Sequence, residues 1–329
     1  MRAWQVHQWG EPEQMKFAEA PLAEPGPGQV RIRVQAAGLN FFDLLQIQGK
    51  YQVKPSFPFT PGAEVAGRIE SVGPGVTAFR DGERVMAFPE GGGFAESVVA
   101  AGNRVFPLPE GMDFAIGASL LVYHTSYFAL KQRAALRAGE WLLVHAGASG
   151  VGMSAIQIGL TLGARVIATA GSPEKLEFAC AQGAAHALLY TDGSWVDRIK
   201  EITGGHGADV IYDPVGGDVF DLSTRSIATE GRLVVVGFAS GRIPTIAANR
   251  ILLKDISIVG AVWGNYAFRT PGYMGEVHEE LMTLFARGLI RPAITRTWPL
   301  ERAPEGLRAL AERRVMGKAV VRLISTGEN

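Results

Sequence analysis

The chain has 329 residues, and its 32 lysines and arginines balance 32 aspartates and glutamates to a formal net charge of zero. Proteins that follow a nucleic-acid backbone carry a basic stripe or tail, and no run of like charge occurs here, so the composition argues against a nucleic-acid partner. The single cysteine, Cys180, permits no internal disulfide and no zinc site of several cysteines. The length fits about two domains. The N-terminal residues lack the apolar core of a signal peptide, which makes a cytoplasmic protein the expectation.

The first 110 residues are expected to be rich in β-strands. Residues 30–34 alternate apolar and polar side chains with period two, and residues 65–72 form a second run of strand-forming residues. Glycines and prolines interrupt the chain at short intervals, for example at Pro25-Gly26-Pro27-Gly28. Short strands separated by such turns are typical of an all-β region.

Residues 141–164 are long and apolar enough to be mistaken for a membrane span, because His145 is the one ionisable side chain among them. The run is broken, however, by Gly147-Ala148-Ser149-Gly150. The residues after this break carry apolar side chains at helical spacing. We therefore predict a strand over 141–146, a glycine turn and a helix over 151–163, and no membrane span.

From this point strands and helices are expected to alternate. A second strand is predicted over 165–170, followed by a helix that begins at Ser172-Pro173 and ends near Gln182. Further strands are predicted over 187–190, 208–213, 233–238 and 256–260, with helices near 195–203 and 218–228. This alternation indicates an α/β fold with a doubly wound parallel sheet.

The last part of the chain returns to a different pattern, with helices near 275–287 and 303–313 and a final strand over 319–323. A wound middle segment between two β-rich ends predicts that one domain is inserted into another.

The glycine turn is the sharpest motif, with the spacing Gly147-x-x-Gly150-x-Gly152 in place of the usual G-x-G-x-x-G. Glycines allow a tight turn and a close approach of a pyrophosphate, whose charge is met by free N–H groups and by the positive end of the helix dipole. The position of the turn, after the first strand of a wound sheet, predicts a dinucleotide site. The residues expected to line it are Ala148, Ser149, Gly150 and Val151.

The end of the second strand bears on the choice between NAD and NADP. An NAD site would place an aspartate or glutamate there for the ribose 2′-hydroxyl, but this strand ends in Ala170-Gly171-Ser172. Lys175 follows one turn into the helix, where its ammonium and the Ser172 hydroxyl can hold a 2′-phosphate. The negative charge of Glu174 argues against a phosphate at this place, unless that residue interacts with the helix dipole. The alternative for Lys175 is a solvated surface lysine. NADPH is favoured.

Several separated motifs carry a resemblance to a known family: residues 36–43, 61–67, 82–85, 148–152 and 213–217. On these motifs the whole chain resembles the medium-chain dehydrogenase/reductase superfamily, and within it the zinc-independent quinone oxidoreductase (zeta-crystallin-like) branch. The resemblance implies a GroES-like, β-rich catalytic domain made of residues 1–122 and 264–329. It also implies that a Rossmann doubly wound parallel sheet over residues 123–263 is inserted into that domain.

Zinc alcohol dehydrogenases of this superfamily carry a G-H-E-x-x-G segment, whereas this chain has Gly62-Ala63-Glu64. Asn40 stands near the position of their first cysteine ligand, and no cysteine precedes residue 180. The six histidines show no paired spacing of metal ligands, so most of them are expected at the surface or as satisfied core residues. We expect no metal site.

The resemblance places Asn40 and Tyr51 in the substrate cleft and Thr125 beside the nicotinamide. Each residue also has a structural interpretation: Asn40 as a loop tie, Tyr51 as a half-buried aromatic ring, and Thr125 as a hydroxyl bonded within its own helix turn. The resemblance assigns Lys175 and Tyr190 to the 2′-phosphate, beside Gly171 and Ser172. It further places along the cofactor Val215, Gly216, Phe238, Ala239, Ser240 and Lys318.

Together these features predict an NADPH-dependent, zinc-independent reductase that transfers hydride to a quinone. Reduction of an enone or enoyl-type C=C bond is the alternative, because it needs the same cofactor pose, and an NADPH-binding structural protein with little turnover is an alternative of another class. We predict no dominant acid or base, with Asn40, Tyr51 or a water as hydrogen-bond donors to the developing oxyanion. The apolar run 256–263 is expected to be an edge strand that joins two copies into a homodimer, unless it is covered within the monomer.

Overall fold

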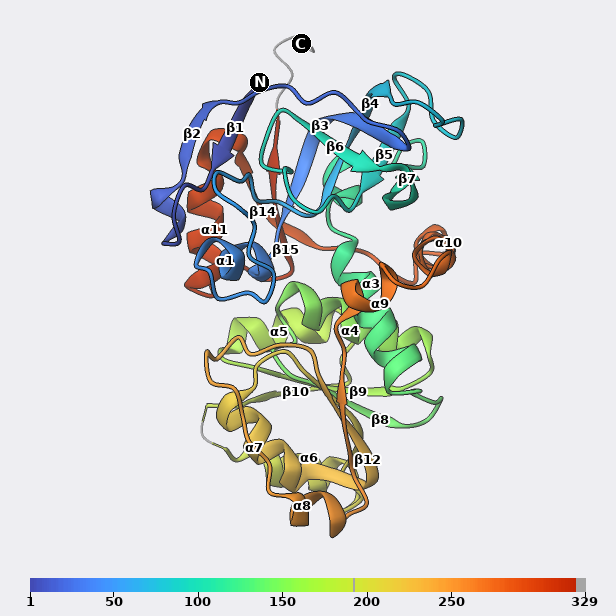
Figure 1. The fold of residues 1–329 in the computed structure, drawn as a ribbon. Coiled ribbons are helices and arrows are strands. Elements are labelled where there is room, and N and C mark those ends of the chain that lie inside the picture. The colour runs from blue at the N-terminus through green and yellow to red at the C-terminus, as the bar shows by residue number, and fades with distance from the viewer. Residues whose placement is uncertain (192, 324–329) are drawn as a thin grey trace. The chain divides into compact units, whose positions relative to one another are not determined.

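The computed structural model describes residues 1–191 and 193–323, which divide into two compact units (Figure 1). Residues 1–121 and the chain from residue 292 onward form the first unit, and residues 122–291 form the second. The expected α/β architecture, a parallel sheet inserted into a β-rich unit, is confirmed.

The second unit keeps the segment that carries helices α9 (Trp263–Ala267) and α10 (Tyr273–Ala286), which we expected to belong to the first unit from residue 264 onward. Aromatic packing is the reason for this difference. The ring of Phe128, near the start of the second unit, lies 5.1 Å from the ring of Tyr266 on α9. It also lies edge-on to the ring of Tyr273, the first residue of α10. The chain therefore returns to the first unit at residue 292.

The first unit is built on a seven-stranded sheet in which strands from both ends of the chain are neighbours. Six of its strands are paired in the order β14-β15-β3-β4-β5-β7, and the seventh, β6, is paired with β3. A separate hairpin of β1 (Arg2–Gln5) and β2 (Lys16–Glu19) precedes it. The sheet strands are β3 (Gln29–Leu39), β4 (Val65–Val72), β5 (Arg84–Ala87), β6 (Ser97–Ala101), β7 (Val105–Pro107), β14 (Ile294–Pro299) and β15 (Lys318–Arg322).

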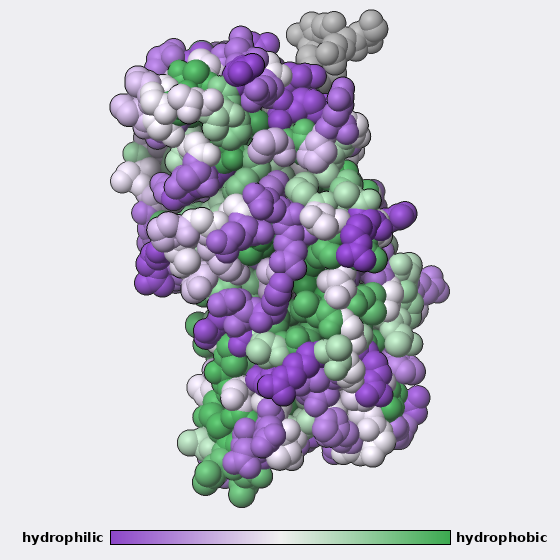
Figure 2. All heavy atoms as spheres, turned by 90° about the vertical axis from the view of Figure 1, so that its right-hand side faces the viewer, coloured by the Kyte–Doolittle hydropathy of each residue, from purple (hydrophilic) through white to green (hydrophobic). Residues whose placement is uncertain are grey.

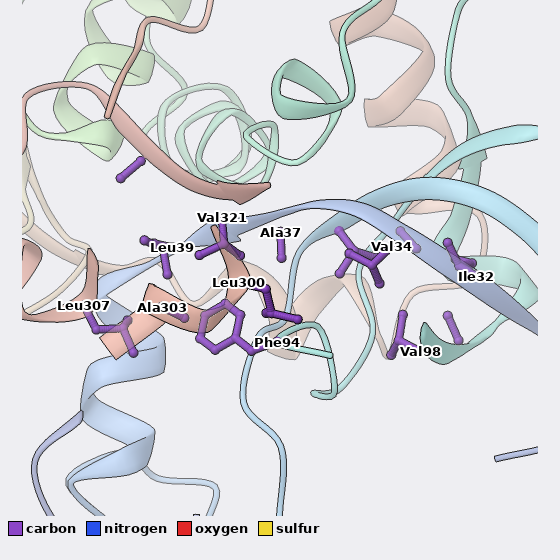
Figure 3. Close-up of a cluster of buried hydrophobic side chains, with 14 of the residues drawn as sticks. Ile32, Val34, Ala37, Leu39, Phe94, Val98, Leu300, Ala303, Leu307 and Val321 are labelled. Atoms are coloured by element: carbon purple, nitrogen blue, oxygen red, sulfur yellow. The ribbon is translucent and has the colours of Figure 1, made fainter. Parts of the chain in front are cut away.

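The core of the first unit lies between this sheet and helix α11 (Ala303–Ala311) (Figure 3). Leu39 of β3 and Val321 of β15 share the cluster with Leu307 of α11, and all three are at most 2% exposed. Burying apolar side chains from both chain ends in one cluster holds those ends together. Two further helices complete the unit, α1 (Phe41–Ile47) and α2 (Phe114–Gly117).

The second unit contains a six-stranded sheet in which every pairing is parallel. The order β10-β9-β8-β11-β12-β13 runs outward from β8 in both directions, so that the topological switch point lies between β8 and β11. The strands are β8 (Trp141–Val144), β9 (Arg165–Ala170), β10 (His186–Leu189), β11 (Ala208–Asp213), β12 (Ile227–Val235) and β13 (Ser257–Gly260). The connecting helices are α4 (Gly150–Thr161), α5 (Pro173–Ala181), α6 (Trp195–Ile202), α7 (Gly217–Ser226) and α8 (Ala248–Leu252).

The strand, glycine turn and helix predicted over residues 141–163 are confirmed by β8 and α4. Within the described residues, no helix is long and apolar enough to cross a membrane. Before β8, helix α3 (Leu121–Tyr127) continues into a turn of π-helix over Phe128–Arg133.

Strand β12 differs from the prediction, because it begins at Ile227 and not near residue 233. Helix α7 correspondingly ends at Ser226, before the predicted end near residue 228. The strand contains an irregularity, in which Glu230 adopts a left-handed φ of 58° and the pairing register with β11 shifts. A Glu-Gly pair looks like a loop in the sequence, and the strand continues across it because Ile227 before the pair and Arg232 after it are both paired with β11.

Candidate functional site

The predicted nucleotide residues of the second unit lie in the loops, or in the first helical turns, that follow successive strands of the parallel sheet. Because parallel strands all end at the same edge, these loops share that edge. The loop after β8 holds residues 146–149, Gly171 and Ser172 follow β9, and Tyr190 follows β10. The loops after β11 and β12 hold Val215, Gly216, Phe238, Ala239 and Ser240. Gly150 and Val151 begin α4, and Lys175 lies in the first turn of α5. Lys318 belongs to the first unit.

The glycine loop after β8 ends in a capped helix. The hydroxyl oxygen of Ser149 accepts a hydrogen bond from the Gly152 N–H at 3.1 Å, so Ser149 is the N-cap of α4. A Cβ on Gly152 would lie 2.1 Å from the carbonyl oxygen of Ala146, which requires glycine there. The loop thus packs directly on the first turn of α4, whose N–H groups and dipole favour an anion.

A buried histidine supports this loop from below. His145 Nδ1 lies 2.8 Å from the Thr169 hydroxyl of β9, and Nε2 lies 2.8 Å from the Ser223 hydroxyl of α7. Ser223 donates its own proton to the Val219 carbonyl, so Nε2 carries the hydrogen. Burial lowers the pKa of His145 to about 3. It is therefore a neutral, satisfied core histidine, as expected from the sequence.

At the end of β9, the predicted phosphate residues form a small cluster. Gly171 lies 3.6 Å, measured from an ideal Cβ, from the ring of Tyr190. The backbone N–H of Tyr190 donates to the carbonyl of Ala170 at 3.2 Å. The Ser172 hydroxyl hydrogen-bonds the carboxylate of Glu174 and thereby lowers its pKa. Glu174 is therefore turned toward Ser172, in the first turn of α5, which Lys175 shares.

The loops after β11 and β12 are tied to each other and to Asp213. One carboxylate oxygen of Asp213 accepts from the N–H groups of Val215 at 2.8 Å and Gly216 at 3.0 Å. Gly216 adopts a φ of 68°, which an L side chain rarely takes. The Ser240 N–H donates to the Val215 carbonyl at 2.9 Å. Two predicted cofactor loops thus form one hydrogen-bonded surface.

In the first unit, Asn40 lies in a buried polar cluster. Its Oδ1 accepts from the Lys318 ammonium at 2.8 Å, and its Nδ2 donates to Glu64 at 3.0 Å. Lys318 and Glu64 also form an ion pair of 3.0 Å, with side chains 2% and 0% exposed. The backbone N–H of Asn40 donates to Asp43 at 2.9 Å, at the start of α1, where burial raises the pKa of Asp43 to about 7. Asp43 thus has a structural role, at the start of α1.

Tyr51 and Thr125 are placed separately. Tyr51 follows α1, half-buried, with its ring edge-on to Phe42 at a centroid distance of 4.5 Å. Burial raises the pKa of the Tyr51 hydroxyl, so it keeps its proton at neutral pH. Thr125 lies half-buried on α3, in the second unit. Lys318 and Asn40 are thus in direct contact, while the roles of Tyr51 and Thr125 stay predictions.

One pair was not anticipated from the sequence: Tyr127 and Lys131 have the Tyr-x-x-x-Lys spacing of a tyrosine acid–base pair. The Tyr127 hydroxyl donates to Glu280 of α10, and Lys131 contacts both Tyr127 and Glu280. Burial, together with Glu280, raises the pKa of Tyr127. An acid–base tyrosine needs the opposite shift, so this cluster fastens α10 to α3 and to the π-helical turn that follows it.

Glu64 and Lys318 could have drawn attention as a pair, because each is a charged residue within an apolar stretch of strand-forming residues. A charge in such a stretch must find a partner if it is buried. The sequence does not show which partner, because the two residues are 254 positions apart. Among the described residues, no group of three or more histidine, cysteine, aspartate or glutamate side chains could hold a metal ion.

Both units of the chain match known protein families. Residues 26–110 match the family Alcohol dehydrogenase GroES-like domain, and residues 150–280 match the family Zinc-binding dehydrogenase. The chain is 37% identical over 300 residues to Quinone oxidoreductase-like protein 2 homolog of Nematostella vectensis, covering 90% of this chain and 82% of that protein.

Two solved structures share the fold over nearly the whole chain. Escherichia coli quinone oxidoreductase complexed with NADPH is 28% identical with a TM-score of 0.92, covering 98% of this chain and 100% of that one. CurK enoyl reductase is 26% identical with a TM-score of 0.89, covering 98% and 99%.

A GroES-like, β-rich unit with an inserted, doubly wound sheet and a glycine loop at its switch point defines the class of medium-chain dehydrogenases and reductases. The chain belongs to this superfamily, and within it to the quinone oxidoreductase-like branch.

Substitution of Asp213 by asparagine should stabilise the protein at pH 8 and leave its stability unchanged at pH 4. Burial raises the pKa of Asp213 to about 6. The folded state therefore disfavours the carboxylate, and the cost grows from the pKa of the unfolded chain upward and is complete above the folded pKa. The neutral amide avoids a cost of at most about 3 kcal/mol and keeps an oxygen for Val215 and Gly216.

Urea unfolding at both pH values measures this effect. Asp218→Asn is the matched control, because its side chain, in the first turn of α7 after the same loop, is 94% exposed. An Asp213→Asn variant that gains no stability at pH 8, or gains as much at pH 4, would contradict the interpretation.

Proposed function

We propose that this protein is an NADPH-dependent, zinc-independent reductase that transfers hydride to a quinone. The observation that carries the proposal is the edge of the parallel sheet. There the glycine loop opens onto the capped first turn of α4, and the end of β9 offers Ser172 and Lys175 where an NAD site would have a carboxylate. The likeness to a quinone oxidoreductase complexed with NADPH supports it.

The residues present fit the cofactor. The first turn of α4, with Ser149 and Gly152, suits a pyrophosphate, because its N–H groups meet the charge without a side chain in between. Ser172, Lys175 and Tyr190 suit a 2′-phosphate. The Ser172 hydroxyl donates its one proton to Glu174 in this structure, so a bound 2′-phosphate must replace that carboxylate as the acceptor. When bound, NADPH supplies the hydride.

The chain itself orients the reactants and supplies hydrogen bonds. Reduction of a quinone or an enone places negative charge on an oxygen, which a nearby donor stabilises. The Tyr51 hydroxyl stays protonated and can donate to that oxygen. Tyr127 is held by Glu280 with a raised pKa, so its proximity to Lys131 does not make it a base. We therefore propose that no side chain is a dominant acid or base.

Replacing Tyr51 by phenylalanine tests this mechanism. We expect kcat with a quinone to fall by no more than about 100-fold, the loss of one hydrogen-bond donor. Phe42→Leu, which removes the ring that packs on Tyr51 and keeps the hydroxyl, separates packing from donation. A loss of many orders of magnitude in a folded Tyr51→Phe variant would make Tyr51 an essential acid and sink the proposal.

Reduction of an enoyl C=C bond is the second candidate function, because the fold is also that of an enoyl reductase. The test is a steady-state screen of 1,4-benzoquinone, 1,2-naphthoquinone, simple enones and enoyl thioesters, each with NADPH and with NADH. We expect quinones to be reduced with the highest kcat/KM and NADPH to be preferred. Selective turnover of thioesters would overturn the quinone assignment, and stoichiometric NADPH binding without oxidation would indicate a binding protein.

Lys175→Ala serves as the cofactor control in that screen. Loss of the ammonium should narrow the preference for NADPH over NADH by about tenfold, because a charge-assisted hydrogen bond to phosphate is lost. Lys200→Ala, a surface lysine of α6 in the same unit, should leave the preference unchanged. An unchanged preference in Lys175→Ala would show that the 2′-phosphate is held elsewhere.

We also propose a homodimer through the edge of the parallel sheet. Strand β13 is the last strand in the order, and large apolar side chains near it are exposed, among them Leu253 at 78%. Figure 2 shows hydrophobic surface gathered toward the lower end of the view, over the second unit. The exposed large apolar side chains between residues 243 and 262 are those of Ile243, Leu252, Leu253 and Val262.

Sedimentation at micromolar concentration should give twice the chain mass of 35.2 kDa. The double change Leu252→Glu and Leu253→Glu should shift the protein toward the monomer, because charge on an apolar interface costs its desolvation. Val53→Glu, an exposed apolar residue of the first unit, is the control. A monomeric wild-type protein would show that this surface has another role.

A further inference from the structure

The cluster of Asn40, Glu64 and Lys318 arises from strand register. Leu39 of β3 pairs with Ala319 of β15 in antiparallel register, so the next residue outward on β3 and the preceding one on β15 are neighbours. The backbone N–H of Gly38 donates to the Glu64 carbonyl at 2.9 Å and brings Glu64 to the same place.

Gly38 leaves the space that the Glu64 carboxylate uses. A Cβ on Gly38 would lie 2.4 Å from Glu64 Oε2 and 2.3 Å from the carbonyl oxygen of Ala118. Contacts this short are not found for real Cβ atoms, so the carboxylate could not lie over the backbone of β3 if residue 38 had a side chain. The sheet is thus shaped to admit one buried carboxylate beside Asn40.

The chemistry of the neighbours determines how the Asn40 carboxamide is turned. The oxygen and nitrogen of such a group are hard to tell apart by shape alone. An ammonium only donates and a carboxylate only accepts, so Oδ1 must face Lys318 and Nδ2 must face Glu64. If the carboxamide were rotated by 180°, Nδ2 would face the Lys318 ammonium, a donor against a donor. Oδ1 would then face the Glu64 carboxylate, an acceptor against an acceptor.

We propose that Lys318 and Glu64 are positioning residues for hydride transfer, which hold the Asn40 carboxamide in this single orientation. The inference rests on the proposed reductase function with Asn40 at the substrate. Among the described residues, the second N–H of Nδ2 reaches the Gly38 carbonyl alone, at 3.5 Å, a weak contact. In the proposal this N–H is the donor to the substrate oxygen. Donation from the Lys318 ammonium to Oδ1 polarises the amide and strengthens this N–H as a donor.

Burying the ion pair of Glu64 and Lys318 costs the desolvation free energy of both charges. Both members are almost fully buried, and apolar replacements of such pairs in other proteins are often neutral or stabilising. Its position beside a polar side chain of the site gives it a role that apolar residues cannot supply. The other oxygen of Glu64 accepts from the N–H of Leu121 at 2.6 Å, the first residue of α3, so the same carboxylate also fixes the start of that helix.

The test is the double variant Glu64→Gln with Lys318→Met. It removes both charges together, so no lone ion is left buried, and the glutamine oxygen can still accept from Leu121. We expect a folded protein whose kcat with 1,4-benzoquinone falls by about tenfold or more. The KM for NADPH should change by less than about threefold, because the Lys318 ammonium donates to Asn40 and Glu64. A larger rise in this KM would instead support the cofactor contact that the resemblance implies for Lys318, and would count against the positioning role.

A matched control comes from the same sheet. Arg31 and Glu70 form an ion pair of 3.0 Å with side chains 12% and 19% exposed. The double variant Arg31→Met with Glu70→Gln should keep the wild-type kcat. In an Asn40→Ala background, the Glu64→Gln and Lys318→Met changes should cause little further loss of kcat, because they act through Asn40.

A second readout does not depend on activity. In protein labelled with 15N-asparagine, the Asn40 side-chain proton that is hydrogen-bonded to Glu64 should exchange slowly with water in the wild type. It should exchange rapidly in the Glu64→Gln, Lys318→Met variant and stay slow in the control. If the wild type reduces nothing in the screen, the proposed function fails, and this signal alone decides whether the orientation is held.

Three results would overturn the proposal. One is a folded Glu64→Gln, Lys318→Met variant with wild-type kcat, and another is slow exchange of the same Asn40 side-chain proton in that variant. The third is an equal loss of kcat with and without Asn40, which would show that the ion pair serves the fold and not the carboxamide.

Discussion

The antiparallel pairing of β15 with β3 is the constraint on which the rest of the structure depends. It joins strands from the two ends of the chain. Leu39 of β3 and Val321 of β15 bury their side chains in the same cluster. Because both ends must meet in this sheet, residues 122–291 form a unit with its own core. The same pairing sets Lys318 against Asn40, so the fold of the first unit and its polar cluster have one cause.

In the second unit, the parallel sheet plays the corresponding role. Every strand ends at the same edge, and the chain order reverses between β8 and β11. The glycine loop, the end of β9 and the loop held by Asp213 therefore share one edge. His145 links β8, β9 and α7 beneath the glycine loop and stays neutral because it is buried. Hydrogen bonds within the sheet and its helices thus support the edge that carries the predicted nucleotide residues.

Local sequence patterns predicted the strands and helices whose bounds depend on neighbouring residues. They failed where contacts between distant residues set the bounds. Strand β9 matches its prediction because six consecutive residues suit a buried strand and Ser172-Pro173 starts the next helix. The start of strand β12 was predicted too late, because Glu230 and the glycine after it resemble a turn, and the pairing of Ile227 with Ala208 of β11 before them is not visible in the sequence. The return to the first unit was placed too early, because the packing of Phe128 on Tyr266 is not visible in the sequence.

The sequence by itself determined the α/β class, the glycine turn before α4, the missing carboxylate after β9 and the replacement of a histidine by Ala63, because each is a matter of residue type at a local spacing. Only the tertiary structure decided that Asn40 contacts Lys318 and Glu64, and that Tyr127 with Lys131 fastens α10. The physical reason is that a charged or polar group takes its role from its burial and its partners. Those partners come from strand register and helix packing over hundreds of residues.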